Sequence, residues 1–199
     1  ADDAAAVQAR LNQFAARPEI GGLVIDLGQD ARVAAAHAQA DDRLACPSAK
    51  NIVAAAIREL IVRHRTQHPE LEYVVLVGND AVIPFFRHPD QGLLANENNY
   101  IPPVLASSAS EAALQLGYFL TQDDYAAGCD LAWKTGSLPL PDLGIGRLVE
   151  TPAEITAVLD AYESTPDGVV PTPTTALATG YDFLADTAEA ITTEFRAGL

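Results

Sequence analysis

The run YVVLVGND at residues 73–80 constrains the fold more than any other part of the chain. A continuous stretch of aliphatic and β-branched residues is typical of a strand that is buried on both faces, as in a parallel sheet. It follows the segment 47–68, whose apolar spacing and opening Pro47 predict a long helix. A long helix that leads into a buried strand indicates an α/β chain.

The same alternation continues along the chain. The spacing of apolar residues predicts further helices over 2–17, around 109–117, 151–164 and 185–199, and further strands over 21–28, 143–148 and 175–183. Alternating elements predict a three-layer α/β sandwich with a mainly parallel sheet. Ligands of such folds bind at the carboxyl ends of the strands, which here are Asp26, Asn79 and Asp80, Arg147, and Tyr181 and Asp182.

The charge of the chain argues against two classes of partner. Its 199 residues include 27 acids against 12 Lys and Arg, which gives a formal charge of −15. Such a field repels nucleic acid and anionic membrane surfaces, so we expect neither as a partner. No apolar run approaches the roughly 20 residues of a membrane span. The acidity agrees with a secreted setting or with cation binding.

Gly144 and Gly146 lie just before a predicted helix and raise the question of a phosphate-binding turn. A dinucleotide fingerprint needs a third glycine three residues later, where this chain has Val149. Both glycines also fall inside a predicted strand, and there is no Walker lysine. A nucleotide binder is therefore the least favoured function.

The segment TQDDYAAGCD (121–130) brings three carboxylates close together in sequence. Asp123, Asp124 and Asp130 carry the oxygen ligands that Ca²⁺ prefers, although their spacing is not that of an EF-hand. A solvated acidic loop is the alternative explanation. We expect no required cofactor, and calcium is the one ion that this segment could bind.

The four histidines and two cysteines do not form an obvious nucleophilic pair. His64 and His68 lie one turn apart at the end of a predicted helix, where they suit its C-terminus and lack a third zinc ligand. For Cys46 and Cys129, two buried thiols are favoured over one disulfide. No serine stands in a Gly-x-Ser-x-Gly turn.

Four segments, taken in order, resemble the gingipain-like cysteine peptidases, which belong to the same clan as the caspases. They are YVVLVGNDAVIP, TQDDYAAG, LPDLGIGRLVETPAEITAVLDAYE and ALATGYDFLAD. The family typically has an aliphatic strand with a Gly-Asp type turn, an Asp-Asp-x-Tyr segment, a strand ending in Gly-Arg and a Thr-x-x-Glu helix. The resemblance covers about residues 70–199 and is most specific over 139–163.

The resemblance implies a caspase-like α/β sandwich and roles for several residues. Gly146 would allow close backbone packing, and Arg147 would form an ion pair with Asp124 or Asp142. Asp186, with Asp182 as a rival, would line the pocket that receives a basic side chain of the substrate. The alternative is that both are ordinary acids of a strand end and a helix start.

Members of the family place a catalytic histidine and cysteine after the matched region, and this chain contains no histidine and no cysteine after Asp142. We therefore expect 1–167 to be an N-terminal Rossmann-like subdomain and 168–199 the first strand and helix of a truncated catalytic subdomain. The expected function is that of an inactive fragment of a secreted or cell-surface cysteine endopeptidase, which meets peptide or protein substrates through its parent. The alternative is a non-enzymatic, calcium-stabilised or partner-binding α/β module.

Overall fold

The computed structural model describes residues 2–43, 45–92, 94, 96–133, 136–165, 175, 177–180 and 182–198. The chain divides into two compact units, Ala1–Thr156 and Ala157–Leu199. Helix α5 (Pro152–Glu163) crosses from the first unit into the second. The second unit also contains the short 3-10 helix η6 (Asp182–Leu184) and helix α6 (Ala185–Gly198).

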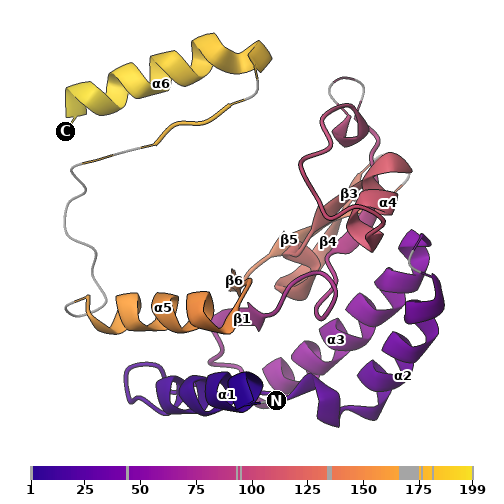
Figure 1. Ribbon diagram of the computed structural model, residues 1–199, viewed down its shortest axis with the longest axis vertical. Coiled ribbons are helices and arrows are strands. Elements are labelled where there is room, and N and C mark those ends of the chain that lie inside the picture. The colour runs from indigo at the N-terminus through magenta and orange to yellow at the C-terminus, as the bar shows by residue number, and fades with distance from the viewer. Residues whose placement is uncertain are drawn as a thin grey trace. The chain divides into compact units, whose positions relative to one another are not determined.

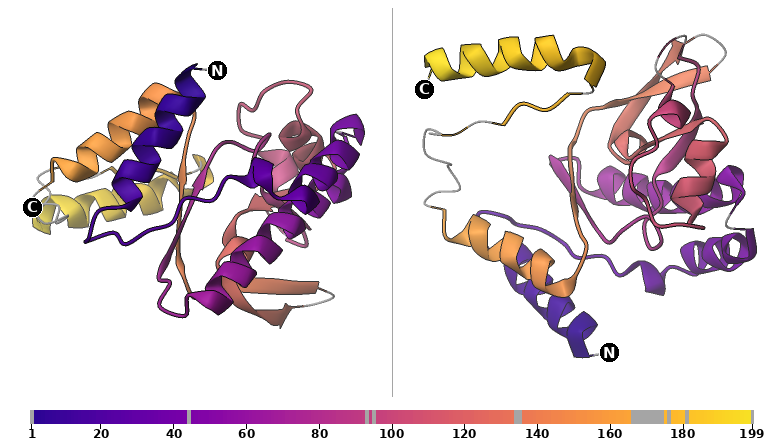
Figure 2. Two further views of the ribbon diagram at one scale, coloured as in Figure 1. Left: turned by 90° about the horizontal axis from the view of Figure 1, so that it is seen from below. Right: turned by 45° about the horizontal axis from the view of Figure 1, so that its top comes forward.

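The helices of the first unit follow the predicted order, with one addition. They are α1 (Asp2–Ala15), α2 (Ala31–Ala40), α3 (Pro47–Gln67) and α4 (Ala109–Gln115). Helix α2 was not predicted; it begins at Asp30, whose side chain accepts hydrogen bonds from two backbone N–H groups of the first turn. Helices α2 and α3 lie side by side (Figures 1 and 2).

In the described part of the first unit, the strands form three two-stranded sheets. Strand β1 (Tyr73–Val77) pairs in parallel with β6 (Gly144–Leu148). The other two sheets are antiparallel and join β2 (Phe86–Pro89) to β3 (Tyr118–Thr121) and β4 (Ala127–Trp133) to β5 (Gly136–Pro141). The α/β class and the parallel pair are confirmed, whereas the three-layer sandwich stays a prediction.

Two predicted strands do not appear among the residues that the structure describes. Over 21–28 the chain is irregular and then forms the 3-10 helix η1 (Leu27–Gln29); Leu23 is largely exposed, so this apolar run has no partner strand to bury it. In the predicted strand 175–183 the described residues 175 and 177–180 have no regular structure, and η6 follows. The predicted boundary at residue 167 lies outside the described residues and stays a prediction.

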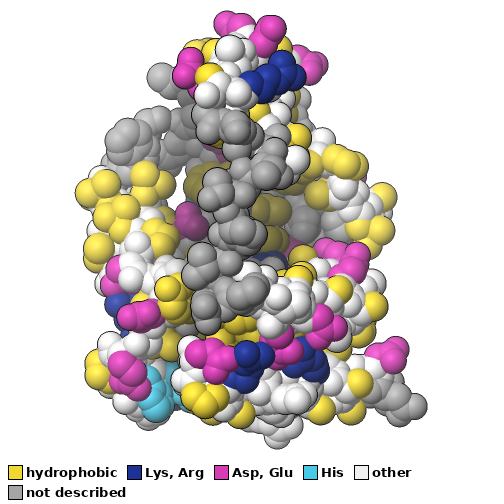
Figure 3. Space-filling model, turned by 90° about the vertical axis from the view of Figure 1, so that its left-hand side faces the viewer, with side chains coloured by type: hydrophobic (Ala, Val, Ile, Leu, Met, Phe, Trp, Pro, Cys, Tyr) yellow, Lys and Arg dark blue, Asp and Glu magenta, His cyan; other side chains and the backbone are white. Residues whose placement is uncertain are grey.

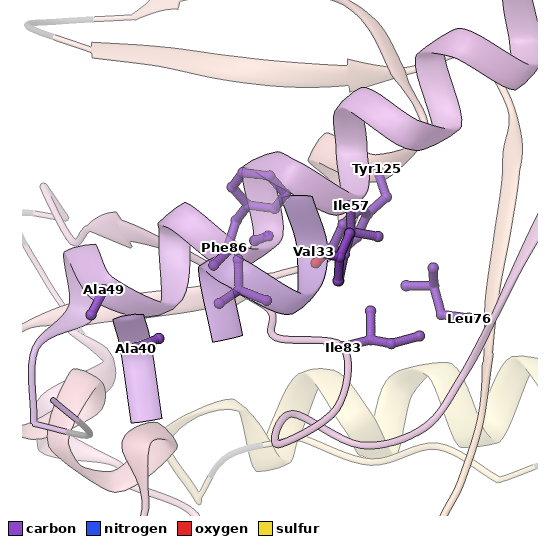
Figure 4. Close-up of a cluster of buried hydrophobic side chains, with 11 residues drawn as sticks. Val33, Ala40, Ala49, Ile57, Leu76, Ile83, Phe86 and Tyr125 are labelled. Atoms are coloured by element: carbon purple, nitrogen blue, oxygen red, sulfur yellow. The ribbon is translucent and has the colours of Figure 1, made fainter. Parts of the chain in front are cut away.

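The core of the first unit lies between α2, α3, β1 and β2 (Figure 4). Val33 and Ile57 from the two helices contact a cluster that includes Leu76, Phe86 and Tyr125. Burial of each large side chain of this kind stabilises a fold by about 1.5–3 kcal/mol. The cluster therefore fixes β1 and β2 against α3.

Helix α5 begins with the predicted capping box. The carboxylate of Glu154 accepts a hydrogen bond of 2.9 Å from the backbone N–H of Thr151, and the Thr151 hydroxyl oxygen accepts one of 3.3 Å from the Glu154 N–H. These bonds satisfy N–H groups that a helix start leaves without a partner. The prediction for this helix start is confirmed.

Acidic side chains outnumber basic ones in the sequence, and the same surplus is visible on the surface (Figure 3). Acidic side chains are scattered over the face seen in Figure 3 and exceed the basic ones there. Among the described residues, no helix is long and apolar enough to cross a membrane.

Candidate functional site at the carboxyl ends of the parallel strands

Strands β1 and β6 end next to each other, with Val77 opposite Leu148. The backbone N–H of Gly78 then donates a hydrogen bond of 3.0 Å to the Leu148 carbonyl. Gly78 has a φ of +135°, and a Cβ there would lie 3.2 Å from the Cβ of Val82, so only glycine fits easily. The loop that begins here, residues 78–85, occupies the edge of the sheet where α/β folds bind ligands.

Asp80 anchors this loop from within. One carboxylate oxygen accepts a hydrogen bond of 2.8 Å from the backbone N–H of Phe85. The other accepts bonds of 2.6 Å from the Arg87 guanidinium and of 2.6 Å from the Ser110 hydroxyl. The carboxylate therefore joins the loop to β2 and to α4.

Arg87 is the largest fully buried side chain of the described residues. Its guanidinium contacts the Asp80 carboxylate and the Phe85 carbonyl. Its backbone exchanges two hydrogen bonds of 2.8 and 2.9 Å with the side-chain amide of Asn51 on α3. A buried charge needs a partner, and here the partner is Asp80.

Arg147, at the end of β6, binds the same loop from the other side. Its Nη1 donates to the carbonyls of Gly78, at 2.7 Å, and Ile83, at 2.8 Å. Its Nε donates to the Gln122 side chain at 3.1 Å, and its guanidinium carbon lies 4.2 Å from the centre of the Phe85 ring. Burial lowers the pKa of Arg147 because it removes water from the charge.

The predicted ion pair of Arg147 with Asp124 or Asp142 is wrong. Within the described ranges those two carboxylates pair with His88 and with Arg65 instead. The prediction failed because the Arg147 guanidinium donates its hydrogen bonds to backbone carbonyls of the loop. A sequence pattern does not show such contacts with the backbone.

The predicted close approach at Gly146 is also wrong. A Cβ added there would meet nothing within 4 Å, whereas one added at Gly144 would lie 2.7 Å from the Tyr73 ring. The register, which places Tyr73 opposite Gly144, decides which glycine is crowded.

His88 and Asp124 form a half-buried pair that the sequence did not reveal. His88 Nε2 lies 3.0 and 3.2 Å from the two carboxylate oxygens of Asp124. The hydrogen bond to Asp124 raises the pKa of His88, against the opposing effect of burial. Strand β2 carries His88, and the 3-10 helix η4 (Asp123–Tyr125), which carries Asp124, follows β3. Only the pairing of β2 with β3 brings the two together.

The three predicted calcium ligands do not lie in one cluster. Asp123 is exposed at the start of η4, Asp124 faces His88, and Asp130 on β4 lies 3.9 Å from Arg58. Across the described part of the chain, no three His, Cys, Asp or Glu side chains come together as a metal site. The calcium site stays a prediction.

The two acids predicted to bind substrate lie in the second unit. Asp182 is exposed at the start of η6, and Asp186 is exposed in the first turn of α6, where its carboxylate accepts a bond of 2.9 Å from the Thr187 N–H. This is the position of an ordinary helix-start acid. Their role in substrate binding stays a prediction.

Both cysteines are free and exposed. The predicted burial of Cys46 and Cys129 is therefore wrong, and so is a disulfide between them. Histidine side chains lie close to other groups: His37 to the Val82 carbonyl, His68 to Glu70 and His88 to Asp124. For the residues that the structure describes, no hydrogen bond joins a cysteine to a histidine.

Comparison with known proteins gives one result. The family model Peptidase family C25 matches residues 22–196, which include the loop 78–85, Arg147 and most of helix α6. No curated protein matches the chain, and no solved structure matches it. The family match spans most of the chain and agrees with the motifs of residues 70–199. The chain belongs to peptidase family C25, the gingipain family.

Proposed function

We propose that residues 1–199 form the supporting part of a gingipain-like cysteine endopeptidase: they shape one wall of the substrate cleft and contain neither its nucleophile nor its base. The family match carries this proposal, because it assigns the chain to cysteine peptidases. We further propose peptide or protein substrates and a secreted or cell-surface location, with which the charge of −15 agrees.

The surroundings of the two cysteines support the absence of the nucleophile. A catalytic thiol needs a base within hydrogen-bond reach. Cys46 lies exposed at the start of α3, and Cys129 lies exposed on β4. Neither has a histidine partner among the described residues, so neither is placed to attack a peptide bond.

The carboxyl ends of β1 and β6 support the role of a cleft wall. Asp80 and Arg147 hold the loop 78–85 through hydrogen bonds to its backbone. A binding site is most effective when its supporting contacts fix it in advance. A rigid loop at the edge where ligands bind is the part of a wall that substrate would meet.

The chemistry of the complete enzyme follows from its class. A cysteine thiolate attacks the scissile carbonyl, the amine leaves with a proton from the paired histidine, and water then hydrolyses the thioester. We place this cysteine and histidine outside residues 1–199. Asp186, with Asp182 as the rival, is proposed to contact a basic side chain of the substrate.

Serine substitutions test the proposal. In the full-length protein that contains these residues, Cys46→Ser, Cys129→Ser and the double variant should keep kcat/KM for a peptide substrate within about twofold of wild type. Removal of a true nucleophile would lower the rate by on the order of a thousandfold or more. Such a loss in either single variant, with an unchanged melting temperature, would place the nucleophile inside this chain and contradict the proposal.

A further inference from the structure

The loop after β1 has an exposed apolar tip. Ala81 is exposed, and 53 % of the Val82 surface is accessible. The carboxyl ends of the parallel strands lie beside this tip, since Gly78 is bonded to Leu148. An apolar tip at this edge is available to a ligand that binds there.

The tip is held at both sides. Arg147 Nη1 donates to the carbonyl before the tip, that of Gly78, and to the one after it, that of Ile83. Within the loop, the side-chain oxygen of Asn79 accepts a bond of 3.1 Å from the Ala81 N–H. His37 Nε2 lies 3.1 Å from the Val82 carbonyl.

The far end of the loop is fixed as well. The buried Tyr125 hydroxyl donates a hydrogen bond of 2.6 Å to the Pro84 carbonyl, and Asp80 accepts from the Phe85 N–H. Exposed loops are usually mobile, and a ligand that orders one must offset the lost entropy. Here protein contacts have already ordered the loop.

We infer that the loop 78–83 contacts the substrate directly, with Val82 as a specificity residue that takes an apolar side chain of the peptide and Arg147 as the positioning residue of the loop. The inference rests on the proposed function. Val82 offers two methyl groups and no polar side-chain atom, so it favours an aliphatic over an amide side chain. Arg147 acts only through the two carbonyls that it binds.

Kinetics of the full-length protein test the inference with matched variants. The substrates are pairs of peptides. The two members of a pair differ at one position, which is Leu in one peptide and Asn in the other, and each pair varies a different position. Val82→Thr keeps the shape and replaces a methyl group with a hydroxyl. At one peptide position, Val82→Thr should reduce the preference for Leu over Asn, measured as the ratio of the two kcat/KM values, by about threefold to tenfold. The change should lie in KM and not in kcat. Val62→Thr, at a valine of α3 that is 48 % exposed, is the control and should leave the preference unchanged.

Arg147→Lys tests the positioning role, because an ammonium group cannot bind both carbonyls in the geometry of a guanidinium. The preference for Leu should fall as in Val82→Thr. Hydrogen exchange of the Val82 and Ile83 amides, which both donate to the Asn79 carbonyl, should accelerate by about tenfold. A purely structural role would lower the melting temperature and leave the preference unchanged.

The outcomes separate the two proposals. If the wild-type protein cleaves no peptide, the proposed function fails and this inference fails with it. If wild type cleaves peptides but Val82→Thr matches Val62→Thr at every position, only the inference is overturned. A lowered Leu preference in both Val82→Thr and Arg147→Lys supports it.

Discussion

Two arginine–aspartate pairs stand at opposite ends of the parallel strands. Arg87 and Asp80 lie beyond the carboxyl end of β1, 2.6 Å apart, with side chains that are 0 % and 16 % exposed. Arg65 and Asp142 lie near the amino end of β6, 2.5 Å apart, with side chains that are 32 % and 49 % exposed. Both are pairs of a guanidinium with a carboxylate, but the first pair is buried and the second is partly exposed to solvent.

The difference in burial predicts which end of the sheet is the more rigid. The Asp80 carboxylate has two further donors, Phe85 and Ser110, and its loss would leave a buried guanidinium without its charge partner. Water and salt screen the Arg65–Asp142 pair. We therefore expect the carboxyl end to be the stiffer end of the sheet, and the proposed cleft wall lies there.

The largest expected effect comes from Asp80→Ala. We expect the free energy of unfolding to fall by about 3–5 kcal/mol, because Arg87 stays buried without a counter-charge. Denaturant unfolding measures this, with Asp142→Ala as the matched control. The double variant Asp80→Leu, Arg87→Met should recover part of the loss. Equal losses in Asp80→Ala and Asp142→Ala would remove the distinction between the two ends.

Gly78→Ala tests the stiffness of the loop. A positive φ and the nearby Val82 side chain should together lower the stability by about 1–3 kcal/mol. Gly117 also has a positive φ, of 75°, but no atom lies within 4 Å of an added Cβ. Thermal unfolding should therefore show a smaller loss for Gly117→Ala, and the reverse order would mean that Val82 does not crowd Gly78.

The His88–Asp124 pair predicts a dependence on pH. The folded protein holds the His88 proton more tightly than the unfolded chain, so the pKa of His88 lies above its usual 6.5. The resulting stability is complete below that value and is lost as the pH rises through the raised pKa. As the pH rises above 6.5, wild type should lose more stability than His88→Gln. Parallel curves for the two proteins would disprove the effect.

The exposed pair should respond to salt. The hydrogen bond from Arg65 lowers the pKa of Asp142, so its contribution is present above the ordinary aspartate pKa and is lost as the pH falls through the lowered value. Asp142→Asn should lower the melting temperature slightly in dilute buffer and leave it unchanged in concentrated salt. Asp80→Asn should lower it in both, and an Asp142→Asn effect that persists in salt would show that this pair is not screened.

Calcium should have the smallest effect. Because the three carboxylates do not lie in one cluster, a site must form on binding and should be weak. Millimolar calcium should then raise the melting temperature by about one or two degrees. The combined Asp123→Asn, Asp130→Asn variant should abolish the rise. A rise that survives these substitutions would place calcium elsewhere, and no rise in wild type would end the calcium proposal.

The sequence predicted those helices and strands whose residue pattern is visible within one short segment. The run at 73–77, the Gly-Arg strand, helix α3 and the capped start of α5 were all visible in sequence. The strand predicted over 21–28 failed because an apolar run becomes a strand only where a partner strand is available. The pairing of β2 with β3 was missed because it joins two segments that lie far apart in the sequence, on either side of a proline-rich stretch. Strands β4 and β5 are neighbours in the sequence, but β5 contains Pro139 and Pro141, which are unusual within a strand and hide its pattern.

In the candidate site, too, some residues could be predicted from the sequence and others could not. Asn79, Asp80 and Arg147 were predicted at strand ends, because the carboxyl end of a parallel strand can be located from the strand itself. Their partners were not predicted. Arg87 and Ser110 come from a strand and a helix that only the tertiary fold brings to Asp80. His88 met Asp124 through the same missed pairing of β2 with β3.

The most direct test of the central proposal is to find the reactive cysteine of the full-length protein. A thiol-directed peptidyl probe, followed by digestion and mass spectrometry, identifies the labelled residue. We predict that the label is on a cysteine outside residues 1–199 and that a competing peptide substrate prevents labelling. A label on Cys46 or Cys129 that substrate prevents would show that this chain contains the nucleophile, and would contradict its assignment as the supporting part of the peptidase.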